Sequence, residues 1–183
     1  PDSAVVGDTL SCGWSGYSDP DGDPDSSSLA WEINGVSAGS GAVLPTGFVG
    51  ADVITCTVTP FDGTDAGTPV LATLVIDNTA PVVGLVSIIP ASGVTVNTVL
   101  TCTATATDVD GGTPTLTYAW DADGITLGIG GSVDLSGTGI TKGQDVTCTA
   151  TVTDLSGDTS IGSASVTVGN TAPEIVGASI ESS

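Results

Sequence analysis

Aspartate gives this sequence most of its capacity for chemistry. Asp and Glu number 21 against one Lys or Arg and no His, for a net charge of −20 at pH 7. The acids gather in stretches rich in Gly and Pro, such as SDPDGDPD at 18–25 and PFDGTDAG at 60–67. Carboxylates in flexible loops are the ligands that Ca²⁺ prefers, but Asp, Gly and Pro are also good turn formers. Both interpretations stay open at this point.

The same composition argues against catalysis. Without His, the usual proton-transfer group near neutral pH is missing. Lys142 is the only base that could activate a Ser or Thr nucleophile. A two-carboxylate hydrolase is conceivable on acids alone, yet these acids lie in open, Gly-rich loops, where shared cation binding is the better expectation. We therefore expect a protein that is not an enzyme.

The charge also excludes some partners. Nucleic-acid binding needs Lys and Arg to displace counterions from phosphates, and an anionic membrane surface attracts the same residues. No stretch is long and apolar enough to span a membrane. We expect neither nucleic-acid binding nor membrane insertion by this segment.

An internal repeat organises the chain. The motif Asn-Thr-Ala-Pro at 78–81 recurs at 170–173, an offset of 92. The other matched pairs are Cys12 with Cys102, Trp31 with Trp120, and Cys56 with Cys148. Repeats of this kind mark tandem structural units. The sequence predicts one module at 1–78, a second at 79–173, and a segment at 174–183 that begins a following module or is donated to one.

Alternating residues predict that both modules are all-β. In 100–107, apolar residues and Cys102 alternate with Thr, and 146–153 repeats this pattern. The first module shows the same alternation around Cys12, with Trp14 in the inward phase of that cysteine, and around Cys56. Period-two alternation indicates strands with one buried face. Asn34-Gly35 and Asp123-Gly124 predict tight hairpin turns.

The order of cysteine and tryptophan resembles the immunoglobulin superfamily. In that fold, strand B carries a Cys, strand C a buried Trp, and strand F a second Cys. Here Trp31 stands between Cys12 and Cys56, and the order is repeated in the second module. The resemblance implies two tandem immunoglobulin-like Greek-key β-sandwiches with Trp31 and Trp120 in their cores.

The resemblance also implies a disulfide pairing. One inter-sheet bridge joins strands B and F in each module, which pairs Cys12 with Cys56 and Cys102 with Cys148. Such bridges imply an oxidising, extracellular or cell-surface location. The alternative is zinc held by four thiolates, which the lack of any Cys-x-x-Cys disfavours.

Further stretches resemble PKD-type and related modules of large bacterial surface and secreted proteins. These stretches are TYAWDADG followed by VTCTATVTDLSGDTSIGSASVTV, with DNTAPVVGLVSIIP and NTAPEIVGASI as joints between modules. The resemblance implies a stalk, a spacer or an adhesive repeat.

An immunoglobulin-like fold would gather several acidic loops at one end of each module. We expect calcium at the joint before the second module, and an equivalent site in the first. The predicted ligands are Asp77, Asn78, Asp108, Asp110 and Asp154 at the joint, and Asp19, Asp21, Asp23 and Asp62 in module one.

The two ends of the chain complement each other. The second module has a predicted first strand at Val83–Ile88, whereas only nine residues precede Leu10 in the first. The tail Ile175–Ile180 reads as a first strand without a module. The chain is then one period of a longer covalent array, or a subunit that adds its tail strand to the next copy in a head-to-tail fibre. A third interpretation is a segment boundary without structural meaning.

These expectations favour a structural role. We expect an extracellular spacer, stalk or filament subunit with calcium-stiffened joints, whose partners are neighbouring copies or modules of the same protein. The alternative is an adhesive module that recognises protein or carbohydrate, although few aromatic residues are left to build a sugar-binding platform.

Overall fold

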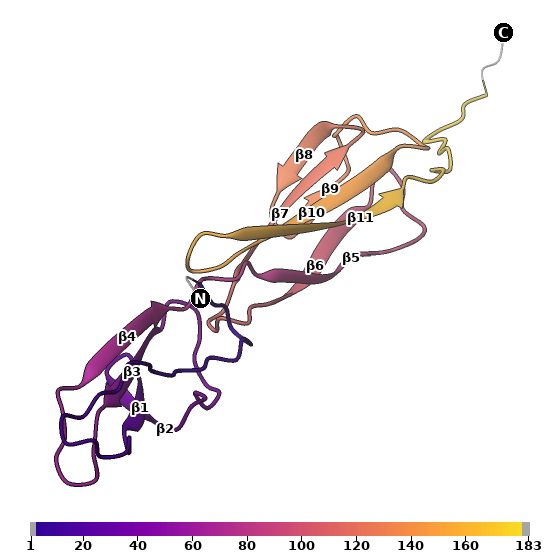
Figure 1. Cartoon of the computed structure of the whole chain (residues 1–183). Coiled ribbons are helices and arrows are strands. Elements are labelled where there is room, and N and C mark those ends of the chain that lie inside the picture. The colour runs from indigo at the N-terminus through magenta and orange to yellow at the C-terminus, as the bar shows by residue number, and fades with distance from the viewer. Residues whose placement is uncertain (1–2, 181–183) are drawn as a thin grey trace. The chain divides into compact units, whose positions relative to one another are not determined.

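A computed structural model describes residues 3–180, and every regular element in that range is a β-strand (Figure 1). The chain divides into two compact units. Unit 1 holds the chain up to Thr79 together with Asp108–Gly112, and unit 2 holds Ala80–Thr107 and the chain from Thr113 onward. No helix in residues 3–180 is long and apolar enough to cross a membrane.

Unit 2 consists of two antiparallel sheets. One has the strand order β11-β10-β7-β8 and the other β5-β6-β9. The four-stranded sheet contains β7 (Thr115–Ala122), β8 (Ile125–Ile129), β10 (Asp145–Thr153) and β11 (Thr159–Thr167). The three-stranded sheet contains β5 (Val82–Ile89), β6 (Val99–Thr107) and β9 (Ser132–Asp134). The edge strand β5, which matches the predicted first strand, also lies beside β11 of the facing sheet.

The core of unit 2 follows from the alternation in the sequence. In β10, Val146, Cys148, Ala150 and Val152 are fully buried, and the threonines between them point outward. Trp120 on β7 is 1% exposed and packs in the same cluster. The apolar phase of each strand therefore faces the opposite sheet, as a half-buried strand requires.

Unit 1 has one regular sheet with the order β2-β1-β3-β4. Its strands are β1 (Ser28–Ile33), β2 (Val36–Ser40), β3 (Val53–Thr59) and β4 (Val70–Val75). Residues 9–18, which the Cys12–Cys56 disulfide joins to β3, meet residues 42–44 in a single bridge between Ser11 and Val43. Figure 1 shows the chain before β1 without a strand arrow.

The prediction of a strand through Leu10, Cys12 and Trp14 was therefore wrong in extent. The N–H of Cys12 donates to Ala42 O at 2.9 Å and that of Leu44 to Leu10 O at 3.0 Å. No neighbour among residues 3–180 continues this ladder on the other side of the segment. An extended segment that is paired at one point on one edge lacks the ladder that defines a strand.

Both predicted hairpin turns are confirmed. Ile33 pairs with Val36 across Asn34-Gly35, and Ala122 pairs with Ile125 across Asp123-Gly124. All four turn residues have positive φ, between 50° and 81°. This is the two-residue turn whose twist matches that of the flanking strands.

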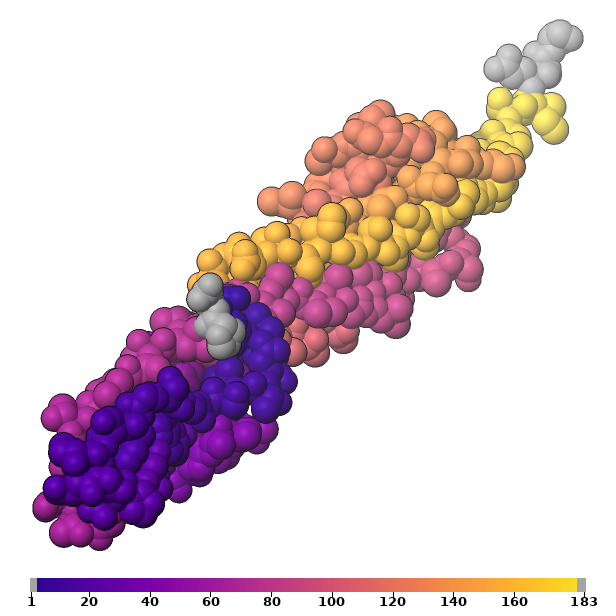
Figure 2. Space-filling model, in the orientation of Figure 1, coloured from indigo at the N-terminus to yellow at the C-terminus, as the bar shows by residue number. Residues whose placement is uncertain are grey.

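The tail is not a strand in this structure. Residues 168–180 have no regular secondary structure, and Ile175, Val176 and Ile180 are 87%, 96% and 102% exposed. Figure 2 shows the segment trailing away from the body of unit 2. Three large apolar side chains are thus left in solvent on one short segment.

Candidate functional site

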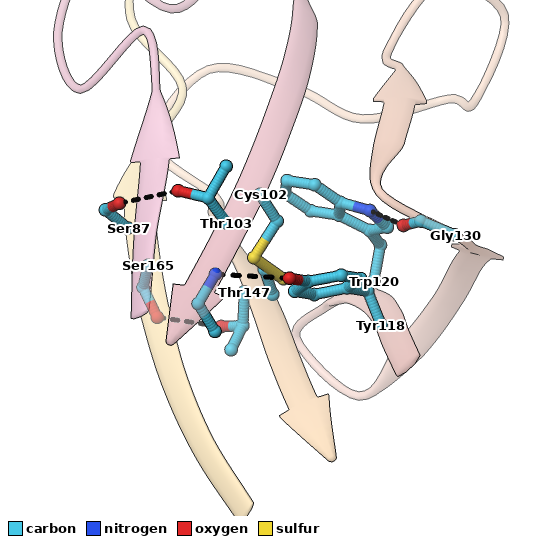
Figure 3. Close-up of a disulfide and its surroundings, with 10 residues drawn as sticks. Ser87, Cys102, Thr103, Tyr118, Trp120, Gly130, Thr147 and Ser165 are labelled. Atoms are coloured by element: carbon cyan, nitrogen blue, oxygen red, sulfur yellow. Dashed lines mark hydrogen bonds between the residues drawn. A yellow bond between two sulfur atoms is a disulfide. The ribbon is translucent and has the colours of Figure 1, made fainter. Parts of the chain in front are cut away.

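The disulfide of unit 2 lies between its two sheets. Cys102 on β6 and Cys148 on β10 are bonded, with their Cα atoms 6.4 Å apart, which is the pairing that the immunoglobulin resemblance implies. The indole N–H of Trp120 donates to Gly130 O at 2.9 Å beside this bridge (Figure 3). The core thus holds a covalent bridge between the layers and a buried indole whose one polar atom is satisfied.

Hydroxyl groups link strands around this core. The hydroxyl of Tyr118 accepts a bond from Ala104 N at 3.1 Å, which joins β7 to β6 (Figure 3). Elsewhere, the hydroxyl oxygens of Ser87 and Thr103 lie 3.0 Å apart and form an exposed cross-strand hydrogen bond between β5 and β6. Small polar pairs of this type hold neighbouring strands in register.

Unit 1 repeats the arrangement with less cover. Cys12 and Cys56 are bonded with a Cα separation of 6.5 Å, and no described cysteine is free. Trp31 is buried, and its indole N–H donates to Gly41 O at 2.8 Å. Cys12, however, is only partly buried, whereas Cys102 is 3% exposed.

The predicted calcium ligands of unit 1 mostly organise their own loops. Asp19 Oδ1 accepts bonds from the N–H groups of Asp21 and Asp23 at 2.8 and 3.1 Å. Asp62 Oδ1 accepts from Thr64 and Asp65 at 2.6 and 2.7 Å. The bonds from Asp65 and Thr64 lower the pKa of Asp62, because they favour the charged form. Each carboxylate therefore acts as a turn acceptor.

Two of the predicted ligands, Asp19 and Asp62, share a hollow with Tyr17. Asp19, Asp62 and Asp65 line a depression of about 210 Å³ together with Tyr17. The Tyr17 hydroxyl is buried without a hydrogen-bond partner. Desolvation, followed by the charges of Asp19 and Asp62, raises the pKa of Tyr17. Asp21 and Asp23 do not line this hollow.

The predicted joint ligands are divided between the units. Asp77, Asn78, Asp108 and Asp110 belong to unit 1, and Asp154 belongs to unit 2. Asp108 Oδ1 accepts from Asp110 N at 2.9 Å, and Thr79 N donates to Asp110 Oδ2. Asp110 Oδ1 and Thr79 Oγ1 are buried without partners. Across residues 3–180, no three His, Cys, Asp or Glu side chains are grouped as a metal would need.

An apolar groove in unit 1 was missed by the sequence analysis. Two adjoining hollows of about 440 and 280 Å³ lie between residues 9–18 and β4, and both reach the Cys12–Cys56 bridge. On β4, Val70 and Leu71 are 65% and 62% exposed at this groove. The signal was the mismatch between the modules, because only the second has a strand ahead of its first cysteine.

Trp14 lies on this groove. Its inward phase led us to expect burial, but it is 45% exposed, so that expectation was wrong. Its indole N–H donates to Asp25 Oδ2 at 2.9 Å. The bonds from Ser27, and then that from Trp14, lower the pKa of Asp25. Trp14 lines the groove but is not part of the core cluster of unit 1.

Comparisons with known proteins give distant likenesses to solved structures. No family model and no curated protein matches the chain. It is similar to the three N-terminal domains of the bacteriophage RB49 outer capsid protein Hoc (17% identity, TM-score 0.36), over 91% of this chain and 55% of that one. It is also similar to fibronectin(III)-like modules of Clostridium thermocellum CbhA (16% identity, TM-score 0.33), over 92% and 91%. Likenesses this weak say nothing of function.

The fold assignment rests on the molecule itself. In unit 2, β5-β6-β9 face β8-β7-β10-β11, a disulfide joins β6 to β10, and a tryptophan lies on β7. These are the A-B-E and C′-C-F-G strands of an immunoglobulin-like sandwich with its B–F bridge. Unit 1 has the same bridge and tryptophan, but its first layer is incomplete. Each unit is an immunoglobulin-like β-sandwich, and within residues 3–180 unit 1 has no counterpart of strand β5.

Proposed function

We propose that the chain is a non-catalytic structural segment of an extracellular or cell-surface protein, in which tandem sandwiches serve as a spacer, stalk or filament subunit. The observation that carries the proposal is the inter-layer disulfide in each unit, beside a buried and hydrogen-bonded tryptophan. Disulfides of this kind persist in oxidising compartments, which supports the location.

The position of the bridges suits a load-bearing role. The two bridges close loops of 44 and 46 residues. A covalent link between strands B and F prevents the enclosed chain from extending even when the surrounding strands separate. A segment under tension would then lengthen less on unfolding, which is useful in a spacer that must keep two points at a fixed distance.

Single-molecule pulling on the full chain tests this role. We expect two abrupt unfolding events, each releasing only residues outside a disulfide loop. Reduction should lengthen each step by about 150 Å, since each loop holds 44 or 46 residues of roughly 3.4 Å when extended. A chain that extends smoothly at low force while oxidised would rule out a load-bearing role.

We propose, in addition, that calcium stiffens the acidic loops. Support comes from Asp110 Oδ1 and Thr79 Oγ1, which are buried oxygens without hydrogen-bond partners beside Asp108. Buried polar groups in proteins are nearly always satisfied, and a carboxylate oxygen such as Asp110 Oδ1 is a typical calcium ligand. The net charge of −20 favours cation uptake in general.

Calorimetry with calcium alone tests this second proposal. We expect heat of binding and a higher melting temperature of unit 1, both reversed by a chelator. Asp110→Asn should weaken the effect, whereas the matched control Glu32→Gln on β1 should not. No heat, together with a melting temperature that a chelator leaves unchanged in the unaltered chain, would reject calcium.

One observation favours the adhesive alternative. Trp14 is exposed beside a groove of about 440 Å³, and aromatic side chains in clefts are common ligand contacts. A shift of Trp14 fluorescence with saccharides or extracellular proteins would support adhesion.

A further inference from the structure

In unit 2, strand β5 fills the space between β6 and β11. It pairs antiparallel with β6, with Val86 opposite Ala104 and Ile88 opposite Cys102. It also packs on β11, where an added Cβ on Gly162 would lie 3.1 Å from methyl groups of Val83 and Val86. The glycine admits β5, and β5 closes the core above the disulfide.

The groove of unit 1 occupies the corresponding place. Cys12 matches Cys102, so residues 9–18 correspond to β6. Ala72 pairs with Cys56 as Ala164 pairs with Cys148, so β4 corresponds to β11. No strand among residues 3–180 takes the position of β5 in unit 1. The groove is therefore an edge-strand position that no residue from 3 to 180 fills.

The side chains around the groove show the effect of the missing cover. Leu74 on β4 is partly exposed, whereas its counterpart Val166 is buried. Cys12 is likewise more exposed than its counterpart Cys102. Trp14, on the same alternating phase as Cys12, is 45% exposed. Apolar surface is left in water along the line that β5 covers in unit 2, and covering it would be favourable.

The tail of the chain matches β5 at several positions. Pro173 matches Pro81 at an offset of 92, and the alignment continues without a gap. At that offset, Ile175, Ala178, Ser179 and Ile180 match Val83, Val86, Ser87 and Ile88. Ile88 is buried in unit 2, whereas Ile180 is fully exposed. The tail thus keeps the inward apolar phase of a strand but has no core to cover.

The tail differs from β5 in size at several positions, with Val176 for Gly84, Gly177 for Leu85 and Ala178 for Val86. At the last of these positions the groove differs in the opposite sense. Two residues of the groove are larger than their counterparts in unit 2. Val70 corresponds to Gly162, and Trp14 corresponds to Ala104. Both groove residues of unit 1 adjoin the place that Val86 occupies in unit 2. The tail carries the smaller Ala178 there. The smaller Ala178 offsets part of this added volume, which is the direction that a close-packed interior favours.

We propose that the segment Pro173–Ile180 of one copy of this chain adds as an edge strand to the groove of unit 1 of a second copy. It runs antiparallel to residues 9–18, with Ile180 opposite Cys12 and Ala178 opposite Trp14, as β5 runs against β6. Repetition of this contact joins copies head to tail. This inference rests on the structural role proposed above. It adds the partner, a second copy of the chain, and the binding site, the groove of unit 1.

A complementation experiment with full-length chains tests the proposal. One variant keeps its tail but has a charged groove (Val70→Asp), and the other keeps its groove but has a charged tail (Ile175→Asp with Ile180→Asp). All three residues are at least 65% exposed, so folding should be unaffected. By sedimentation, we expect the unaltered chain to form concentration-dependent oligomers, each variant alone to be monomeric, and their mixture to stop at 1:1 dimers. Val36→Asp on β2, 70% exposed, is the matched control and should oligomerise normally.

Tryptophan emission provides a second readout. A peptide of residues 171–183 added to the charged-tail variant should shift the emission to shorter wavelength as Trp14 becomes covered. The shift should vanish with Trp14→Phe in the protein or Ile180→Asp in the peptide.

An unaltered chain that stays monomeric, or a mixture of variants that forms no dimer, overturns the proposal. If the unaltered chain is monomeric and only the charged-tail variant binds the peptide, the tail occupies its own groove and a second copy is excluded. The pulling experiment is independent, so the spacer role can stand if strand addition fails.

Discussion

At the scale of single residues, the same device secures both cores. Trp31 and Trp120 each bury an indole ring and donate its N–H to a glycine carbonyl, at Gly41 and Gly130. In each unit this contact ties the strand that carries the tryptophan, β1 or β7, to the glycine that follows the next strand, β2 or β8. A buried indole must find an acceptor, so the tryptophan fixes the path of that following segment as well as filling volume.

Replacing one tryptophan should show the worth of this contact. Trp120→Phe leaves the Gly130 carbonyl without its donor and opens a small void, and we expect a loss of about 2–3 kcal/mol in the free energy of unfolding of unit 2. Trp14→Phe, at an exposed position, is the comparison and should cost far less. Denaturant titration followed by circular dichroism measures both, and equal losses would contradict the prediction.

Tyr17 reports on the acidic loops. Desolvation and then Asp19 and Asp62 raise its pKa above 10.0, so its neutral form stabilises the fold at lower pH, and that contribution is lost as pH rises through the raised pKa. In a Tyr118→Phe chain, phenolate absorbance should follow Tyr17 alone. We expect a midpoint above pH 10 that falls when Asp19 is changed to Asn, since Asn keeps the turn but removes the charge. A midpoint that ignores this change would show that the carboxylate does not act on Tyr17.

At the scale of elements, strands could be predicted from alternation where a partner was present on each side. Residues 100–107 and 146–153 became β6 and β10 as expected. The alternation around Cys12 is similar, yet it produced one bridge, because strand order depends on neighbours as well as on the segment's own pattern. The acidic loops were located correctly in the sequence. Their hydrogen bonding to their own backbone could not be inferred, because clustered Asp residues suit a turn and a cation equally.

The fit between β5 and β11 can be tested inside unit 2. Gly162→Val imitates unit 1 and drives a side chain against Val83 and Val86, so we expect a loss of about 1–3 kcal/mol. Val86→Ala imitates the tail and should relieve much of that loss when the two changes are combined. A double-mutant cycle of unfolding free energies measures the coupling. Strictly additive losses would argue against the size compensation on which the strand-addition proposal relies.

At the scale of the whole molecule, two units of similar length have unequal cores. Unit 2 buries its disulfide beneath a complete layer, whereas in unit 1 the matching surface on Cys12, Trp14 and β4 is open. The disulfide loops are of nearly equal length, at 44 and 46 residues, so they constrain the two unfolded chains almost equally. A difference in stability between the units must then come from burial.

Calorimetry of the full chain should therefore show two melting transitions, with unit 1 the lower. Trp31→Phe should move the lower transition and Trp120→Phe the upper one, which assigns each to its unit. Because a ligand that binds only the folded state stabilises it by mass action, the peptide of residues 171–183 at one hundred times its dissociation constant should add about 2.7 kcal/mol to unit 1 alone. These scans need dilute chains with the charged tail, since the free tails of unaltered copies would compete for the groove. If unit 1 melts with or above unit 2 in that variant, the open groove carries no energetic penalty and the argument for a missing strand loses its physical basis.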